Sequence, residues 1–521
     1  MAIEIHGEKK NAKRRRGTAL SLSLALIFSA CGDDDNKKGD TIIINDDNHD
    51  DDNIPNLIAL HLNVGDSTSA VVPIMTEGSD KIEMPATFTA TVSGFRNESD
   101  AAQVSLKIGP VSGLSMNSQE TIQGDTKTFV VTVQHNGQTT LSCRTETIHV
   151  ELDTIPAGYK YEEGSQSTQI SMRTGATKGC RIQVNQKNIE VFSRYANTTK
   201  GLNLHYELIE NIVLPKSAAG QSNWTAVGID RNHSPFGGSF DGQNHTITGL
   251  EINRPNNDFQ GLFGSIGENG EVENIGLIDI RIVAQNYVGG VSGNVVWAIS
   301  TGAVSGIVRN CYVKGNSTIN GLNRVGGLVG ELESEAFLEN GYSEAQVRGN
   351  NNVGGVVGIG SGLIQNCYAT GDVSGTGYSV GGVMGGASGA SVSYCYATGN
   401  VSGNDYVGGV VGYPHSSTVR SCLALNPSVR STIAHIGRIS GLGMNVALTN
   451  NYAFEDITNS SGNTTWNNKG AGEMDGTDIS AAALNDGSGI PDDFKSFPWT
   501  YEAGRLPGLF EQTIEMPEHL Q

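Results

Sequence analysis

The sequence predicts an all-β chain in which an immunoglobulin-like β-sandwich precedes a right-handed parallel β-helix, a solenoid with coils of about 28 residues. Three observations support this prediction. Glycine makes up 68 of the 521 residues. A short glycine-rich motif recurs at a nearly constant interval in the second half of the chain, as is typical of stacked repeats. The segment before it alternates apolar and polar residues in short runs, as is typical of half-buried strands.

The composition excludes one class of protein and argues against another. A collagen triple helix needs glycine at every third position and far more than the 14 prolines present. The formal net charge of −20 argues against nucleic-acid binding, which depends on dense Lys and Arg contacts with phosphate. We therefore expect no nucleic-acid partner.

Residues 1–30 have the pattern of a lipoprotein signal peptide. A basic run, Lys9–Arg16, precedes the apolar run Leu20–Phe28 and then Ser29-Ala30-Cys31, and the apolar run is too short to cross a membrane. Its end resembles the lipobox of bacterial lipoproteins, although Phe28 stands where leucine is commoner. The resemblance implies that Cys31 is acylated and becomes the mature N-terminus. An ordinary secretion signal is the alternative.

Residues 31–56 are expected to be a disordered acidic tether. The segment Cys31–Asn53 holds nine aspartates and few apolar residues, too few to offset the entropy of ordering. The aspartates directly after Cys31 resemble the export signal of surface lipoproteins in Bacteroidetes-like bacteria. We therefore expect a lipid-anchored protein of the outer membrane that is exposed at the cell surface and contacts the membrane through its lipid alone.

Residues 57–180 are predicted to form the immunoglobulin-like sandwich. Four runs alternate with period two: Phe88–Val92, Val104–Ile108, Phe129–Val133 and Ile148–Leu152. The pair Asn136-Gly137 indicates a hairpin, but the disulfide and tryptophan pattern of true immunoglobulin domains is missing. Cys143 and Cys180 form a disulfide only if their Cα atoms lie close enough, which the sequence leaves open.

Residues 181–458 contain the repeats. A Val-Gly-Gly motif begins at Val288, Val325, Val353, Val380 and Val407, at intervals of 37, 28, 27 and 27 residues, and weaker copies near Phe259 and Ile436 bring the units to seven. The long interval contains an insertion near Val295–Ser305. Such a unit cannot bury its apolar face alone, so we expect each strand to pair in parallel with its equivalent one coil away. The glycine pairs are predicted to make tight corners through positive φ and close backbone approach.

The segment Gly354–Gly375 reads GGVVGIGSGLIQNCYATGDVSG and resembles the GLUG repeat of bacterial surface proteins. The resemblance covers about Ile182–Ala453. It implies parallel β-helices of the kind found in adhesin-like proteins, in haemagglutinin-like filaments and in the non-catalytic part of some immunoglobulin A metallopeptidases. The zinc motif of those peptidases, His-Glu-x-x-His, does not occur in the sequence, so their activity is not implied.

We predict no catalytic residue, no metal site and no cofactor. Between Val353 and Gly412 only Asp372 and Asp405 are charged, whereas acid–base catalysis needs positioned titratable groups. An enzyme would have to use the residues that gather near Trp224: Asp230, Arg231, His233, Asp241 and His245. The expected role of Asp241–His245 is instead a turn whose side chains cap backbone groups.

Two rows of residues run in step with the repeats. The first row should be a ladder of buried free thiols, with disulfides between coils as the minor alternative: Cys311, Cys367, Cys395 and Cys422. The second row should point outward if the cysteines point inward: Tyr312, Tyr342, Tyr368, Tyr396 and Tyr452. Two interpretations of this exposed row stay open: it binds a polysaccharide or protein, or its rings stack on one another to stabilise the sheet.

Residues 459–521 are predicted to cap the last coil, because an open solenoid end exposes unpaired strand edges. Together these features predict a lipid-anchored surface protein, without catalysis, that serves adhesion or binds a host or bacterial surface glycan or protein ligand. The alternative is a carbohydrate-active enzyme, a polysaccharide lyase or hydrolase built on the same scaffold.

Overall fold

The computed structural model describes residues 57–521 except for 68–71, 78–79, 85, 136–142, 162–164, 229–233, 299 and 301. The predicted signal peptide, Cys31 and the acidic tether lie outside the described residues. So do the Asn136-Gly137 hairpin and the candidates Asp230, Arg231 and His233. Within the described residues, no helix has the length and apolar character needed to span a bilayer.

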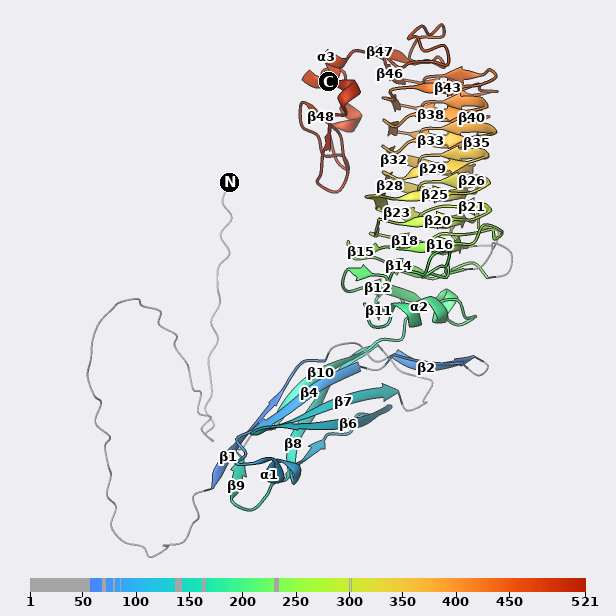
Figure 1. The fold of residues 1–521 in the computed structure, drawn as a ribbon. Helices are drawn as coiled ribbons and strands as arrows, with labels where there is room; N and C mark the ends of the chain where they lie inside the picture. Colours follow the sequence, from blue (N-terminus) through green and yellow to red (C-terminus); the bar gives the residue numbers. More distant parts are fainter. Residues whose placement is uncertain are drawn as a thin grey trace, which may run out of the picture. The chain divides into compact units, whose positions relative to one another are not determined.

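The first folded module is a sandwich of two sheets (Figure 1). In β4 (Ala86–Ser93), Phe88, Ala90 and Val92 are buried while Thr89 between them is exposed, which is the predicted alternation. One sheet also contains β1 (Ile58–Val64), β6 (Leu114–Gln123), β7 (Thr126–His135) and β9 (Tyr159–Tyr161). The other contains β5 (Ser105–Ile108), β8 (Arg144–Thr154) and β10 (Gln166–Met172). A hairpin, β2 (Val72–Glu77) and β3 (Asp80–Met84), and a short helix, α1 (Glu98–Ala102), complete the module.

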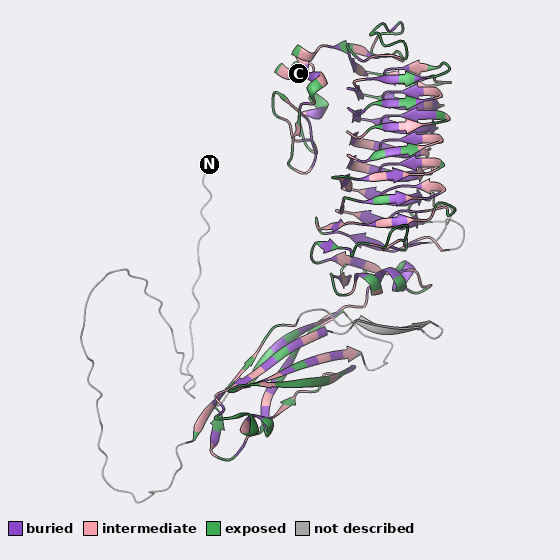
Figure 2. Cartoon of the chain, in the orientation of Figure 1, coloured by how far each residue is buried: buried purple, intermediate pink, exposed green. Residues whose placement is uncertain are grey.

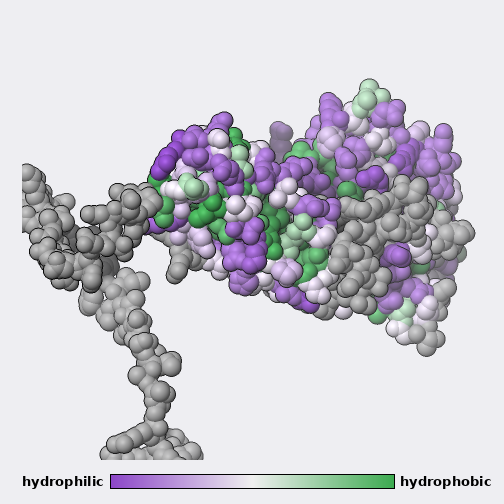
Figure 3. All heavy atoms as spheres, turned by 90° about the horizontal axis from the view of Figure 1, so that it is seen from below, coloured by the Kyte–Doolittle hydropathy of each residue, from purple (hydrophilic) through white to green (hydrophobic). Residues whose placement is uncertain are grey.

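The sandwich has a hydrophobic core of its own. Figure 3 shows hydrophilic residues over much of the face that it draws, with apolar patches between them. Cys143 and Cys180 form a disulfide with their Cα atoms 5.7 Å apart, which answers the question that the sequence left open.

From residue 182 onward the chain forms a parallel β-solenoid, as predicted (Figure 1). Ten apolar residues, one per coil, pair in sequence along one sheet: Ile182, Tyr206, Phe240, Val272, Val308, Leu338, Ile364, Val392, Val419 and Leu448. Figure 2 shows buried residues on every coil. The solenoid thus has more coils than the seven visible units, because the coils at its ends turn without the Val-Gly-Gly motif.

Each central coil supplies strands to four parallel sheets. The largest, here called the flank sheet, contains β11 (Ile182–Val184), β12 (His205–Leu208), β13 (Ile212–Val213), β14 (Ser239–Asp241), β15 (Thr246–Thr248), β18 (Glu271–Glu273), β19 (Gly276–Ile278), β23 (Ile307–Arg309), β24 (Tyr312–Lys314), β28 (Phe337–Ser343), β32 (Leu363–Ala369), β36 (Ser391–Ser393), β37 (Tyr396–Ala397), β41 (Thr418–Arg420), β42 (Leu423–Ala424), β45 (Ala447–Thr449), β46 (Tyr452–Phe454) and β47 (Thr477–Ile479).

The other three sheets complete each coil. The second contains β16 (Glu251–Asn253), β20 (Arg281–Val283), β25 (Thr318–Asn320), β29 (Gln346–Gly349), β33 (Val373–Gly375), β38 (Val401–Gly403) and β43 (Val429–Ser431). The third contains β21 (Asn286–Val288), β26 (Asn323–Gly326), β30 (Asn351–Gly354), β34 (Tyr378–Gly381), β39 (Asp405–Gly408) and β44 (Ile436–Gly437). The fourth contains β17 (Phe263–Ile266), β22 (Ser292–Val295), β27 (Val329–Leu332), β31 (Val357–Gly360), β35 (Met384–Ser388) and β40 (Val411–His415).

The glycine pairs are needed for close backbone approach, but the predicted positive φ lies elsewhere. A Cβ atom on Gly355 would lie 2.1 Å from the carbonyl oxygen of Gly382 on the next coil. The left-handed conformation belongs to Asn352, two residues before the first glycine, and to its equivalents Arg324, Ser379 and Tyr406. At each corner, therefore, the glycine pair allows close approach between coils, and the residue two positions before it takes the left-handed conformation.

Aromatic residues close the N-terminal end of the solenoid. The helix α2 (Ile189–Tyr195) places Phe192 within 4.8 Å of the Tyr206 ring and 5.3 Å of the Phe240 ring, measured between centroids. At the other end β47 pairs with β46 and adds a last strand to the flank sheet. The chain then continues through α3 (Ala481–Asp486), η2 (Asp492–Phe494), β48 (Arg505–Leu506), β49 (Ile514–Glu515) and η3 (Glu518–Leu520).

Candidate functional site: the covered flank of the solenoid

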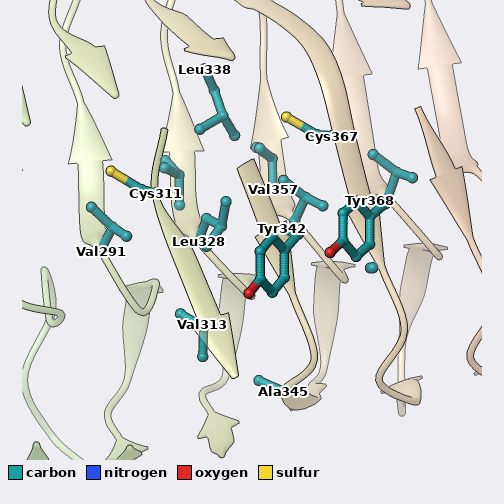
Figure 4. Close-up of a cluster of buried hydrophobic side chains, with 14 of the residues drawn as sticks. Val291, Cys311, Val313, Leu328, Leu338, Tyr342, Ala345, Val357, Cys367 and Tyr368 are labelled. Atoms are coloured by element: carbon teal, nitrogen blue, oxygen red, sulfur yellow. The ribbon is translucent and has the colours of Figure 1, made fainter. Parts of the chain in front are cut away.

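Four tyrosines stack along the flank sheet on consecutive coils. The ring centroids of Tyr312, Tyr342, Tyr368 and Tyr396 are 5.0, 4.7 and 4.9 Å apart, and neighbouring rings are within 5° of parallel. Figure 4 shows the rings of Tyr342 and Tyr368 side by side and parallel. Leu423 takes the next position and Tyr452 the one after it. The parallel register therefore turns a sequence repeat into a continuous row of rings.

The expectation that this row is exposed is wrong. Tyr342, Tyr368 and Tyr396 have only 4, 1 and 0% of their surface exposed, while Tyr312 and Tyr452 are half-buried. The C-terminal segment, residues 480–521, folds back along the flank sheet and covers four of the rings, those of Tyr312, Tyr342, Tyr368 and Tyr396. The cap predicted for the last coil thus covers the side of the solenoid as well.

Aromatic contacts hold the C-terminal segment on the tyrosine row. The Trp499 ring lies 6.1 Å from that of Tyr368 and 5.8 Å from that of Tyr396, and Phe510 lies 5.6 Å from Tyr312. The Tyr396 hydroxyl donates to the carbonyl oxygen of Pro507 over 2.6 Å. Successive coils therefore build the tyrosine row, and the C-terminal segment, which is not a repeat, covers it.

The cysteine row lies inside the coils. Cys311, Cys367, Cys395 and Cys422 are all buried and free of disulfides. Each thiol donates to the carbonyl oxygen two residues earlier, over 3.1 to 3.3 Å. Burial raises the pKa of Cys311 to about 12, so its thiolate is scarce at neutral pH.

These thiols should be unreactive until the solenoid unfolds. For a protein comprising residues 54–521, we expect Ellman's reagent at pH 8 to detect no thiol in the native state and four after denaturation in guanidinium chloride. Because the folded pKa of Cys311 exceeds its unfolded value of 9.0, its contribution to stability should decline as the pH rises from there towards about 12. Rapid labelling of the native protein would contradict the buried ladder.

The structure also contains a row of asparagines that was not predicted from the sequence. Asn274, Asn310, Asn340 and Asn366 all have φ between 52° and 55°, a conformation that asparagine tolerates better than most residues. The Nδ2 of each later asparagine donates to the Oδ1 of the one before it, over 2.8, 3.2 and 3.1 Å. Asn274 donates to Asp241 over 3.0 Å. The sequence feature that could have revealed this row is the asparagine that stands two residues before each of Tyr312, Tyr342 and Tyr368.

A cavity lies between the C-terminal segment and the asparagine and tyrosine rows. Its volume is about 640 Å³, within the range of small-molecule sites. The solenoid side is formed by Asn244, Asn274, Asn310, Tyr312, Asn340 and Tyr342, and the other side by residues 497–500 and 509–512. Trp499 lines the cavity, and its buried Nε1 has no hydrogen-bond partner among the described residues. Aromatic rings and amide groups thus meet at the cavity, and one of the lining residues has a hydrogen-bond donor that is not used.

A charged cluster occupies the flank sheet nearer the N-terminus. Arg181 contacts Asp241 and Glu273, and Arg309 contacts Glu271 and Glu273. Burial, followed by the negative charge of Asp241, raises the pKa of Glu273. Each carboxylate is nevertheless engaged by a guanidinium group, so the cluster has the form of an ion-pair network.

Of the residues expected near Trp224, the structure describes Asp241 and His245. The Asp241 carboxylate accepts from the backbone N–H of Gln243 over 2.9 Å, which is the turn cap that the sequence predicts. The His245 ring instead contacts Asn211. Within the described part of the chain, no group of three or more His, Cys, Asp and Glu side chains is arranged to hold a metal ion.

The comparisons with known proteins concern the repeats. Residues 349–374, which run from the end of β29 into β33, match the GLUG motif. "Halomucin" of Haloquadratum walsbyi is 27% identical over 246 residues, 46% of this chain and 2% of that protein. A "Putative Gly-rich membrane protein" of Evansella cellulosilytica is 32% identical over 160 residues, 26% of this chain and 18% of that protein. The chain thus spans a small part of each relative's length.

Among the solved structures that resemble this chain is one from Bacteroides ovatus. It is titled a "putative immunoglobulin A1 protease from Bacteroides ovatus", and it covers 64% of this chain and 94% of its own with a TM-score of 0.44 and 20% identity. The motif match confirms the GLUG resemblance for the repeat itself. The relatives and the solenoid fold are consistent with a protein of the cell surface.

Proposed function

We propose that this protein is a lipid-anchored adhesin of the bacterial cell surface that binds a glycan or protein ligand through the flank of its solenoid, without catalysis. The observation that carries the binding part is the cavity of about 640 Å³ under the C-terminal segment, lined by tyrosine, tryptophan and asparagine side chains. Sites of this size with mixed aromatic and amide linings are typical of ligand binding. The tyrosine row itself serves as the wall of the cavity instead of an open platform.

The lipid anchor rests on the sequence around Cys31 and is tested by changing that residue alone. In cells that express the whole chain, Cys31→Ser should abolish incorporation of radiolabelled palmitate and should remove the protein from the fraction that external protease digests on intact cells. Lys37→Ser, a nearby substitution outside the cysteine, is the control and should change neither result. If the unmodified protein takes up no palmitate, the segment is an ordinary secretion signal. Unchanged labelling of the Cys31 variant would place the lipid on another residue and would contradict the assignment of Cys31.

A polysaccharide lyase or hydrolase is the second candidate. The observation that favours it is the convergence of Asp241, Glu271 and Glu273 on Arg181 and Arg309. Incubation with polysaccharides, followed by measurement of new reducing ends and of unsaturated products, tests it. Turnover that Glu273→Gln abolishes would favour the enzyme over the adhesin.

A further inference from the structure

We propose that the cavity under the C-terminal segment is a binding site for a short stretch of a neutral polysaccharide. This inference rests on the proposed function, because it names the ligand class of that same flank. Three features of the described residues carry it: a regular array of amide groups, an unused hydrogen-bond donor, and a lining that is almost free of charge.

The amide array presents the same chemistry at regular intervals. Asn274, Asn310 and Asn340 line the cavity on successive coils, which are about 4.8 Å apart in a parallel sheet. The hydrogen bonds along the row use one N–H of each Nδ2 and one lone pair of each Oδ1, and an amide has two of each. Each asparagine of the row, here called a rung, therefore keeps one donor and one acceptor for hydroxyl groups of a ligand.

The spacing of the array favours a saccharide over an extended peptide. A peptide strand returns a side chain to the same face about every 6.6 Å, twice its rise per residue, which does not match the rungs. A chain of single-sugar repeats advances by about one ring per rung. Because each sugar carries hydroxyl groups that both donate and accept, it can use both free positions of each asparagine.

The unused donor is the indole N–H of Trp499. The Trp499 side chain is 96% buried, since only 4% of its surface is exposed, and its Nε1 has no partner in the described protein. Leaving such a donor unpaired costs about 1–3 kcal/mol, so a ligand hydroxyl that reaches Nε1 on binding would recover that energy. Trp224 and Trp466, in contrast, donate to the carbonyl oxygens of Leu262 and Ile457 over 2.9 Å. Trp499 is thus the buried tryptophan that lies at the cavity and lacks an acceptor.

The lining selects against charged ligands. Of the described residues that line the cavity, Glu511 is the only charged one, and none is Lys, Arg or His. An anionic glycan would therefore meet a carboxylate and no cation. At the edge of the cavity Phe497 is 95% exposed, and an exposed aromatic ring can pack against the apolar face of a sugar.

The test uses residues 54–521, which include both folded modules and the C-terminal segment. A glycan array of neutral oligosaccharides is followed by titration of the best ligand, monitored by tryptophan fluorescence and by calorimetry, with hexagalacturonate as the anionic probe. Trp499→Phe removes the donor and keeps a ring in place. Asn340→Gly removes one amide and keeps the left-handed backbone.

Each variant has a matched control away from the cavity. Trp297→Phe changes a half-exposed tryptophan, and Asn450→Gly changes an asparagine with φ of 56° that does not line the cavity. We expect Trp499→Phe and Asn340→Gly each to weaken binding of the neutral ligand about tenfold, the effect of one lost hydrogen bond with a buried group. The two controls should bind as the unmodified protein does.

Three results would overturn the inference: no neutral oligosaccharide binds, hexagalacturonate binds more tightly, or the cavity variants bind as well as their controls. Adhesion of cells that display the protein is measured in parallel. If adhesion persists while the cavity variants change nothing, the adhesin role survives and the assignment of binding to this cavity fails. If adhesion is absent but the isolated protein binds the glycan through the cavity, the site stands and the adhesin role fails.

Discussion

Replacing Gly382 with alanine should prevent the central coils from stacking. The new Cβ would lie 2.1 Å from the carbonyl oxygen of Gly409 and 2.6 Å from the Cβ of Ala397, so it would meet rigid backbone of the next coil and a neighbouring strand. Neither contact can be relieved by rotating a side chain. We expect a loss of more than about 4 kcal/mol in the free energy of unfolding, measured by urea denaturation of residues 54–521.

Gly389→Ala is the control in the same coil. Gly389 has φ of 76°, and a Cβ there would have no atom within 4 Å, so only the backbone conformation is penalised. That penalty is about 1–2 kcal/mol. If the two alanine variants lose equal stability, close approach between coils does not explain the glycine pairs.

Replacing Phe494 with alanine should release the C-terminal segment from the tyrosine row. Phe494 is fully buried and its ring lies 4.9 Å from Trp499 and 6.2 Å from Tyr396. Truncating a buried phenylalanine costs about 3–5 kcal/mol, which falls here on the docking of residues 480–521. Limited proteolysis should then cut this segment much faster, and binding of an apolar dye should increase as the tyrosines become exposed.

Phe497→Ala makes the same chemical change three residues away. Because Phe497 is 95% exposed, its loss should change the rate of proteolysis little. A deletion of residues 480–521 should behave as an extreme form of Phe494→Ala and yield aggregated protein. A monomeric deletion variant with a stable solenoid would show that the segment is a ligand-site wall without a protective role.

The repeats made the solenoid predictable, because a parallel stack places equivalent residues of successive units next to one another. The register of Val353 on Val380 and of Tyr342 on Tyr368 follows from spacing alone. The glycine corners were understood only in part. The sequence cannot show that Asn352 takes the left-handed conformation while the glycines after it are required for space.

Only the solenoid side of the candidate site could be predicted from the sequence. Alternation placed the tyrosines outside the coil, and the structure agrees with that orientation. Their burial depends on Trp499 and Phe510, which have no repeat spacing and reach the row from more than a hundred residues away along the chain. Local pattern cannot reveal such a long-range contact, and for the same reason the cavity and the unpaired indole of Trp499 were not anticipated.

The C-terminal segment has a fixed length, and this length determines which coils it can cover. It leaves the solenoid at β47 on the last coil, and Phe510 reaches back to Tyr312, several coils earlier. Its length is fixed, whereas the number of coils can change when recombination gains or loses a whole repeat. A chain with one unit fewer would keep every corner intact, yet the segment would face a different set of rungs. Repeat number would therefore select which side chains line the cavity, so that unequal crossing-over could alter ligand preference without a single amino-acid substitution.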